Sequence, residues 1–348
     1  MGLYESETYV SDIDLVIKSN SFIFDEIFDK TIFITGGTGL VCSPIVDMIL
    51  RANYILGTKI KLIIAGRSEE KIRQRFEKQK YDYVYYDATK RNTLDLSTDY
   101  IIHGASNSSP TDISTRGIET MIDNIGGIYE LLTYAAENDV INTLYISSSE
   151  IYGQRKTNNQ WMENEYGSID ILLPRNAYSS SKRAAETLCV CFSEEKKIKT
   201  TIVRPGHIYG PTAKRTDTHV SSLFSFAAAD GNNLIMKSSG EQVRSWCYCI
   251  DSAMAILYVL VRGKNKNAYN ISSPNSILSI KEMAQYLSKK AEVQLVVEIP
   301  NEKEERRFNP MFNSSLKSDK LMDLGWKPLF DCEVGFEHTI KVIRESKL

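Results

Sequence analysis

Short apolar runs alternate with amphipathic stretches between residues 31 and 205. Six runs rich in β-branched and aromatic residues are typical of buried strands: Thr31–Thr35, Lys61–Ala65, Tyr83–Tyr86, Tyr100–His103, Thr143–Ser147 and Thr200–Val203. Four stretches between them repeat apolar residues at helical spacing: Ser43–Asn53, Ser68–Lys78, Ile118–Asn138 and Ala177–Glu194. Strands and helices that alternate in this rhythm predict an α/β fold with a doubly wound parallel sheet.

The two ends of the chain follow other patterns. Within residues 1–30, apolar side chains recur at helical spacing, which indicates an extension that packs on the fold: Phe22, Phe24, Ile27 and Phe28. After Pro205 the alternation gives way to a polar segment, a helical stretch at 221–229 and a strand near 268–271.

We therefore expect three parts. An N-terminal extension covers residues 1–30, a dinucleotide-binding domain covers 31–205, and a smaller, irregular substrate domain covers mainly 206–348. The strand near 268–271 is a candidate to rejoin the first sheet. Because a doubly wound sheet binds ligands at the carboxyl ends of its strands, the last part would close one side of that cleft.

The composition indicates which kinds of molecule the protein binds. The chain has 348 residues, 42% of them apolar and 25% charged, with a formal net charge of -2. This balance gives no global positive field for a nucleic acid or an anionic membrane. The first 20 residues lack the features of a secretory signal, and no segment reaches the about 18 uncharged apolar residues that span a bilayer. We expect a cytosolic protein that binds small molecules and other subunits.

Six cysteines in a chain of this length do not form a disulfide scaffold. Two pairs, at 189/191 and 247/249, have Cys-x-Cys spacing rather than the Cys-x-x-Cys of common zinc sites. We expect reduced, mostly buried thiols and no metal.

A glycine-rich turn follows the first strand. The segment from Thr35 to Cys42 reads TGGTGLVC, so Thr38, Leu40 and Val41 belong to it, and a helix begins near Ser43. Gly36 permits a tight turn, Gly39 lets the backbone approach a pyrophosphate, and the helix N-terminus supplies free N–H groups. Cys42 stands where a third glycine is usual. The motif predicts a bound dinucleotide, with a merely structural turn as the alternative.

The tip of the second predicted strand bears on the type of cofactor. It reads Ala65-Gly66-Arg67, without the acid that would accept a ribose 2′-hydroxyl. Because an arginine there tolerates a 2′-phosphate, the cofactor is NAD or NADP, with NADP favoured. Alternatively, Arg67 is a solvated residue at the start of a helix.

A catalytic pair is suggested on the helix after the fifth strand. Tyr178 and Lys182 are at i and i+4, hence on one helix face, and an ammonium together with a cationic nicotinamide would stabilise a phenolate. Ser147, Ser148 and Glu150 come where the preceding strand ends, and a hydroxyl there could fix the reacting oxygen. The alternative is a surface i, i+4 pair.

These motifs together resemble the extended short-chain dehydrogenase/reductase family, in particular its nucleotide-sugar epimerases, dehydratases and decarboxylases. The resemblance extends from about residue 31 to about residue 330. Further matching segments are Tyr86-Asp87-Ala88, His103-Gly104-Ala105-Ser106, Asn124, Arg204-Pro205-Gly206-His207-Ile208-Tyr209-Gly210-Pro211, Arg244, Tyr269-Asn270 and Leu324-Gly325-Trp326-Lys327-Pro328.

The resemblance implies oxidation at C4 of a hexose or uronic acid that is linked to a nucleotide. Ser148 would partner Tyr178, Lys182 would also hold the nicotinamide ribose, and Arg244 would meet the substrate diphosphate. It further implies cofactor contacts at Asp87, Ala88, Gly104, Ala105, Asn124, Ser147 and Pro205, and substrate contacts at Ser148, Ser149, Asn176 and His207. His207, Cys42 and Arg67 depart from the usual family residues.

The reaction itself stays open. Glu150 is similar to a residue of certain dehydratases and uronate decarboxylases and could remove the C5 proton beside a C4 ketone, or it merely bonds a neighbouring backbone group. Ser149 occupies the place of an aspartate found in some dehydratases. We expect an internal redox cycle; the alternatives are an NADPH-dependent 4-keto-sugar reductase and a non-catalytic sensor or scaffold. By the same resemblance, the helices at 118–138 and 177–194 would pair in a homodimer.

Overall fold

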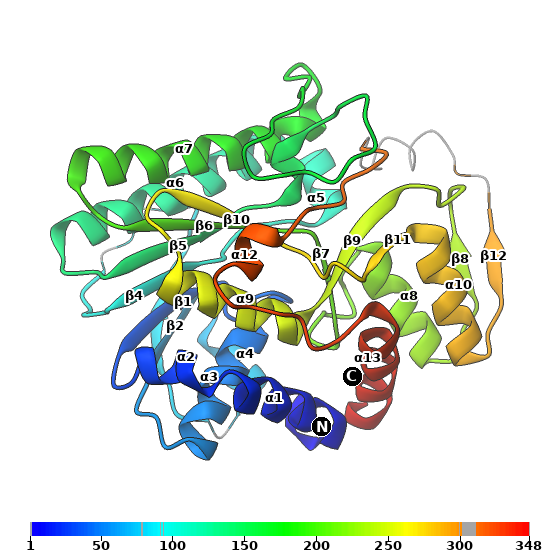
Figure 1. The fold of residues 1–348 in the computed structure, drawn as a ribbon, viewed down its shortest axis with the longest axis horizontal. Coiled ribbons are helices and arrows are strands. Elements are labelled where there is room, and N and C mark those ends of the chain that lie inside the picture. The colour runs from blue at the N-terminus through cyan, green and yellow to red at the C-terminus, as the bar shows by residue number, and fades with distance from the viewer. Residues whose placement is uncertain are drawn as a thin grey trace.

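A seven-stranded parallel sheet forms the centre of the protein (Figure 1). The computed structural model describes residues 2–77, 79–90, 92, 94–298, 300 and 311–347. The strands are β1 (Thr31–Thr35), β2 (Lys61–Gly66), β3 (Asp82–Tyr85), β4 (Tyr100–His103), β5 (Asn142–Ile146), β6 (Thr200–Pro205) and β10 (Asn267–Ile271). Their order is β10-β6-β5-β4-β1-β2-β3, with every neighbouring pair parallel. The predicted doubly wound sheet is confirmed, and β10 does join it.

Helices cover both faces of this sheet. The apolar residues of α3 (Ser43–Ile55) and α9 (Cys249–Arg262) pack on one face with Ile32 and Ile34. On the other face, α6 (Gly117–Glu137) packs on Phe33 and Ile101, and α7 (Ala177–Lys196) packs beside it. The predicted helix at 68–78 is α4 (Glu69–Arg75), and Lys78 lies outside the described residues. The sequence analysis did not single out α9, which is buried along nearly its whole length.

The N-terminal extension packs on the fold, as expected from its helical spacing. Its elements are η1 (Leu3–Glu5), α1 (Glu7–Ser19) and α2 (Ser21–Glu26), and they contact α3, α9 and α13 (Cys332–Ser346). Phe24 and Ile27 are buried there, whereas Phe28 stays exposed. The extension therefore joins the helix after the glycine turn to the last helix of the chain.

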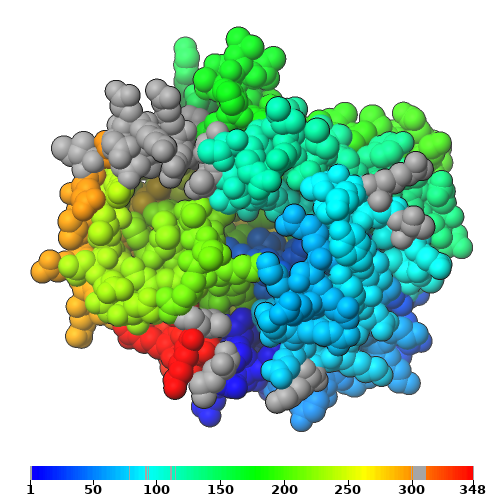
Figure 2. All heavy atoms as spheres, turned by 180° about the vertical axis from the view of Figure 1, so that it is seen from behind, coloured from blue at the N-terminus to red at the C-terminus, as the bar shows by residue number. Residues whose placement is uncertain are grey.

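The residues after 205 build smaller sheets against one end of the main sheet (Figure 1). The elements are β7 (His207–Tyr209), α8 (Val220–Ala229), β8 (Leu234–Met236), β9 (Val243–Tyr248), β11 (Ile277–Ser279), α10 (Ile280–Ala291), β12 (Leu295–Val297) and α12 (Asp319–Met322). Sequence analysis missed the short strands because three residues are too few to show a period of two. Figure 2 shows a hollow between the yellow-green surface of this part and the cyan surface of the main sheet's helices and loops.

Among the helices that the structure describes, none is long and apolar enough to cross a membrane. The cysteines agree with expectation: five of the six are buried, and all six are free thiols.

Candidate active site

A cavity of about 840 Å³ lies at the carboxyl ends of the central strands. Its lining on the side of the main sheet includes Gly36, Gly104, Ser147, Tyr178 and Lys182. The residues after 205 line the other side. A cavity of this size is within the range of about 300–1,000 Å³ that is typical of small-molecule and cofactor sites.

The glycine turn is shaped for close approach of a ligand. Gly36 has φ +72°, and a Cβ atom there would lie 2.7 Å from the carbonyl oxygen of Gly104. The N–H of Gly39 donates to the carbonyl of Gly36 at 2.9 Å. Cys42 is buried against Gly104, where an added Cβ would lie 2.3 Å from the Cys42 sulfur. The thiol thus fills the space between turn and strand, and the turn fits a dinucleotide pyrophosphate at the N-terminus of α3.

The other predicted cofactor residues divide into two groups. Those that line the cavity are Gly36, Gly39, Leu40, Val41, Gly104, Ser147, Tyr178, Lys182 and Pro205. Those that are not among the lining residues are Thr38, Arg67, Asp87, Ala88, Ala105 and Asn124. Asn124 is buried and supports the site from behind, because it accepts a hydrogen bond from Ser106 at 2.7 Å and donates one to Ser181 at 3.0 Å.

Tyr178, Lys182 and Ser148 meet at the floor of the cavity. Both side chains of the predicted pair are buried, with exposed fractions of 6% for Tyr178 and 2% for Lys182. The Lys182 ammonium donates to the carbonyl of Ile146 at 2.8 Å and lies 5.7 Å from the centroid of the Tyr178 ring. Ser148 lines the same cavity and lowers the pKa of the Tyr178 phenol. This geometry is incompatible with a surface i, i+4 pair.

Burial changes the proton affinity of both groups. It raises the pKa of the Tyr178 phenol, and the charge of Glu150 raises it further, while the Ser148 hydrogen bond and the charge of Arg175 lower it. Burial lowers the pKa of Lys182 to about 7, against an opposing effect of Glu186. The phenol is therefore protonated in the protein without cofactor, and Lys182 is close to losing its charge at neutral pH.

Glu150 is held by an arginine that the sequence analysis did not single out. Arg175 donates to both carboxylate oxygens of Glu150, at 3.0 and 3.1 Å, and Ser179 donates at 3.3 Å. The backbone N–H of Glu150 donates to the Ser148 hydroxyl at 3.2 Å. In the sequence, the only feature that pointed to Arg175 was its position three residues before Tyr178. One alternative from the sequence was that Glu150 merely bonds a neighbouring backbone group. In the structure its carboxylate instead forms a bidentate ion pair with Arg175.

The predicted substrate residues do not all lie in this cavity. Ser148, Ser149, His207 and Arg244 line it. Asn176 instead lines a small neighbouring cavity and donates to the carbonyl of Asp170 at 2.8 Å.

Arg244 and His207 are the buried basic groups on the far side. Arg244 is 3% exposed and donates to the carbonyls of Val243 at 2.9 Å and Phe312 at 3.3 Å. Burial lowers the pKa of its guanidinium to about 10. Burial also lowers the pKa of His207, whose Nδ1 is buried without a hydrogen-bond partner among the described residues.

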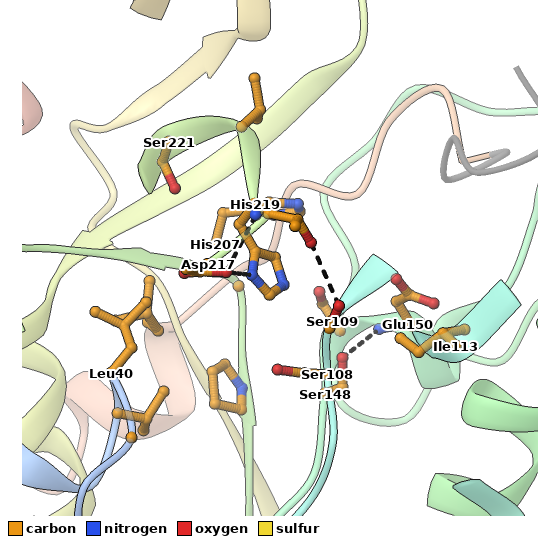
Figure 3. A pocket seen from close by; sticks show the side chains of 18 of the residues that line it. Leu40, Ser108, Ser109, Ile113, Ser148, Glu150, His207, Asp217, His219 and Ser221 are labelled. Atoms are coloured by element: carbon orange, nitrogen blue, oxygen red, sulfur yellow. Dashed lines mark hydrogen bonds and ion pairs between the residues drawn. The ribbon is translucent and has the colours of Figure 1, made fainter. Parts of the chain in front are cut away.

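A histidine–aspartate pair in the cavity wall was missed by sequence analysis. His219 and Asp217 are joined by a hydrogen bond of 2.6 Å, and Ser222 donates to Asp217 at 2.7 Å. In Figure 3 the pair lies across the pocket from Ser148 and Glu150. Burial lowers the pKa of His219, but the Asp217 contact outweighs it and the net shift is upward. The sequence carries no signal for the pair beyond a polar segment.

The described residues contain no group of three or more side chains placed to hold a metal ion.

A doubly wound parallel sheet, a glycine turn after its first strand and a cavity at the strand ends define a dinucleotide-binding protein of the Rossmann type. The family follows from the sequence comparison. The chain belongs to the NAD dependent epimerase/dehydratase family, whose model matches residues 32–272. It is thus an enzyme of the extended short-chain dehydrogenase/reductase type, as the motifs predicted.

Relatives and solved structures agree with this assignment. The chain is 27% identical to human dTDP-D-glucose 4,6-dehydratase over 334 residues, which cover 92% of the chain and 91% of that protein. It is 26% identical to UDP-glucuronic acid decarboxylase 1 of Xenopus tropicalis, over 91% of the chain and 73% of that protein.

Two crystal structures share the fold. The dTDP-glucose 4,6-dehydratase DesIV of Streptomyces venezuelae, with NAD and TYD bound, has a TM-score of 0.77 at 20% identity, over 91% of this chain and 98% of that one. The UDP-glucose 4-epimerase of Thermotoga maritima, with UDP-glucose, has a TM-score of 0.73 at 20% identity, over 91% and 100%.

Proposed function

We propose that the protein modifies a nucleotide-linked sugar by oxidising it at C4, in the manner of an epimerase, dehydratase or decarboxylase. The observation that carries the proposal is the meeting of Tyr178, Lys182 and Ser148 in one cavity with the glycine turn at Gly36. The relatives' names support a nucleotide sugar as substrate.

The chain's own residues would handle the proton of the reacting hydroxyl. The glycine turn at Gly36 and Gly39 would hold a nicotinamide dinucleotide, which would supply a hydride acceptor when bound. The Tyr178 oxygen takes the proton of the C4 hydroxyl, and the Ser148 hydroxyl keeps that oxygen within reach of the phenol. Lys182 is anchored on the carbonyl of Ile146 at the floor of the site and would hold the nicotinamide ribose.

The step after oxidation depends on Glu150. A C4 ketone acidifies the neighbouring C5–H bond, and a carboxylate beside it can take that proton. The ion pair with Arg175 holds the Glu150 carboxylate in a fixed position beside the cavity. Dehydration, decarboxylation and epimerisation all begin from the same ketone.

Two further properties belong to this proposal. We place the protein in the cytosol, in keeping with six free thiols. We also propose a homodimer that pairs α6 and α7 of two copies, because Ile118, Ile122 and Tyr129 of α6 are large apolar side chains exposed by 79%, 60% and 52%.

Replacement of the phenol tests the function. Tyr178→Phe should lower turnover of nucleotide sugars by at least about a hundredfold, because it removes the proton acceptor. Binding of the cofactor, measured by calorimetry, should change little. Tyr85→Phe, at an exposed tyrosine, is the matched control. Turnover retained by Tyr178→Phe would refute the assignment.

A second candidate is an NADPH-dependent reductase of a 4-keto sugar. Arg67, directly after β2, favours it, because an arginine at this place accommodates the 2′-phosphate of NADPH. Consumption of one added NADPH per product would separate this activity from an internal redox cycle, which consumes none.

A further inference from the structure

A row of three side chains crosses the main sheet from the glycine turn to Lys182. Thr35 of β1 is the register partner of His103 of β4, and His103 is the register partner of Tyr145 of β5. Register partners in neighbouring parallel strands point to the same face of a sheet, so the three side chains lie beside one another. Tyr145, the last of them, lies against the ammonium of Lys182. The row therefore connects the turn that would hold a cofactor to the lysine of the predicted catalytic pair.

The contacts along the row are direct. The Thr35 hydroxyl and Nδ1 of His103 are 2.8 Å apart, and the rings of His103 and Tyr145 are stacked with their centroids 5.9 Å apart. The Lys182 nitrogen lies 4.7 Å from the centroid of the Tyr145 ring and 5.7 Å from that of the Tyr178 ring. A cation within about 6 Å of a ring centroid is attracted by the negative face of the ring. Of these two rings, Tyr145 is thus the one nearer to the lysine charge.

Lys182 is buried without an ion pair among the residues that the structure describes. Glu186, one helical turn away, raises the pKa of Lys182 by its charge, but its carboxylate is held by Arg204 at 2.6 Å. The carbonyl of Ile146 accepts one hydrogen bond from the ammonium. Removing an ammonium from water costs free energy, and a ring face that is itself shielded from water offsets part of that cost.

The other ionisable groups around Lys182 are uncharged near neutral pH. Burial, with a further effect of the Lys182 charge, lowers the pKa of His103 to about 3. Burial raises the pKa of Cys42 to about 12, and it also raises the pKa values of Cys189 and Tyr178. A change in the charge of Lys182 near neutral pH is therefore not masked by a second group that titrates beside it.

We propose that Tyr145 is a positioning residue, whose ring face holds the Lys182 ammonium at the floor of the site and favours its charged form. The Tyr145 hydroxyl is buried without a hydrogen-bond partner among the described residues, so the ring makes the contact. The role rests on the proposed function, in which Lys182 supports the Tyr178 phenol and holds the nicotinamide ribose. Tyr145 is not among the residues that line the cavity, so it acts on the reaction through Lys182 alone.

An NMR titration of Lys182 tests the ring without any substrate. In purified full-length protein without cofactor, labelled with carbon-13 at the lysine Cε, the resonance of Lys182 is the one that Lys182→Met lacks. Tyr145→Phe keeps the ring and removes only the unpartnered hydroxyl, so the proton affinity of Lys182 should stay within about twofold. Tyr145→trifluorophenylalanine keeps the shape but weakens the negative face, and relative to Tyr145→Phe it should lower that affinity about tenfold. Phe24→trifluorophenylalanine, at a buried ring of the N-terminal extension, is the matched control and should change nothing.

The outcomes separate this proposal from the proposed function. A proton affinity of Lys182 that differs by less than about twofold between the fluorinated ring and Tyr145→Phe would overturn the proposal. If Lys182 acts in its charged form, turnover should fall as the pH rises through its pKa, and the fluorinated ring should move this fall to lower pH. A lowered proton affinity in a protein that turns over no nucleotide sugar would leave the contact standing and remove the proposed function. Turnover with the same pH profile in both variants would keep the function and remove the role of Tyr145.

Discussion

Asp47 connects the N-terminal extension to the helix that follows the glycine turn. It lies on α3 with no exposed surface and accepts hydrogen bonds from the hydroxyls of Tyr4 and Tyr9. It is also the carboxylate partner of Arg75, whose side chain is only 17% exposed. We predict that Asp47→Asn destabilises the protein strongly, because it leaves the Arg75 guanidinium buried without a counter-ion.

The expected size follows from the burial of the pair. Removing one partner of a buried ion pair costs about 3–5 kcal/mol. Unfolding entropy is about 2.1 cal/mol/K per residue, which for 348 residues gives about 0.7 kcal/mol/K. The melting temperature of Asp47→Asn should therefore fall by about 4–7 °C if the chain unfolds as one unit.

Differential scanning calorimetry can separate the charge effect from a general loss of packing. The double variant Asp47→Asn/Arg75→Met should be more stable than Asp47→Asn alone, because the unpaired charge is gone. Asp230→Asn breaks a surface ion pair with Arg215 and should lower the melting temperature by only about 1 °C. A fall of under about 1 °C in Asp47→Asn would refute the reasoning.

Three further predictions concern the turn, the buried lysine and the dimer. Gly36→Ala should weaken cofactor binding more than about tenfold, as measured by calorimetry. Gly57 has a similar φ of +68° but open space around it, so the control variant Gly57→Ala should lower the free energy of unfolding by only about 1 kcal/mol. In the folded protein Lys182 has a pKa of about 7, so between pH 7 and the ordinary lysine pKa the unfolded chain binds more protons than the folded one. The free energy of unfolding of the wild type, relative to that of Lys182→Met, should therefore rise with pH across this window in chemical denaturation. A difference that does not change with pH would contradict the lowered pKa. If the proposed dimer forms, Tyr129→Glu should convert it to single chains in light scattering. A wild type that is already monomeric would count against the proposed interface.

The sheet was predictable from local patterns, and the contacts across the cavity were not. The six predicted strands differ from the observed ones by at most two residues at either end, because buried parallel strands form continuous β-branched runs. Arg175 carries no local pattern. Its partner Glu150 lies 25 residues away, so only the folded chain brings the two side chains together.

The floor of the cavity contains two ionisable groups whose pKa values burial moves in opposite directions. It raises that of Tyr178 and lowers that of Lys182, so near neutral pH both tend toward their uncharged forms. A neutral phenol is a poor base, and a lysine that is partly uncharged contributes little to a phenolate. The positive charge of an oxidised nicotinamide would favour the phenolate. Cofactor binding should therefore precede proton transfer, and in the protein without cofactor the phenol should show no phenolate absorbance at neutral pH. A phenolate absorbance that the wild type shows without cofactor and that Tyr178→Phe lacks would refute this order.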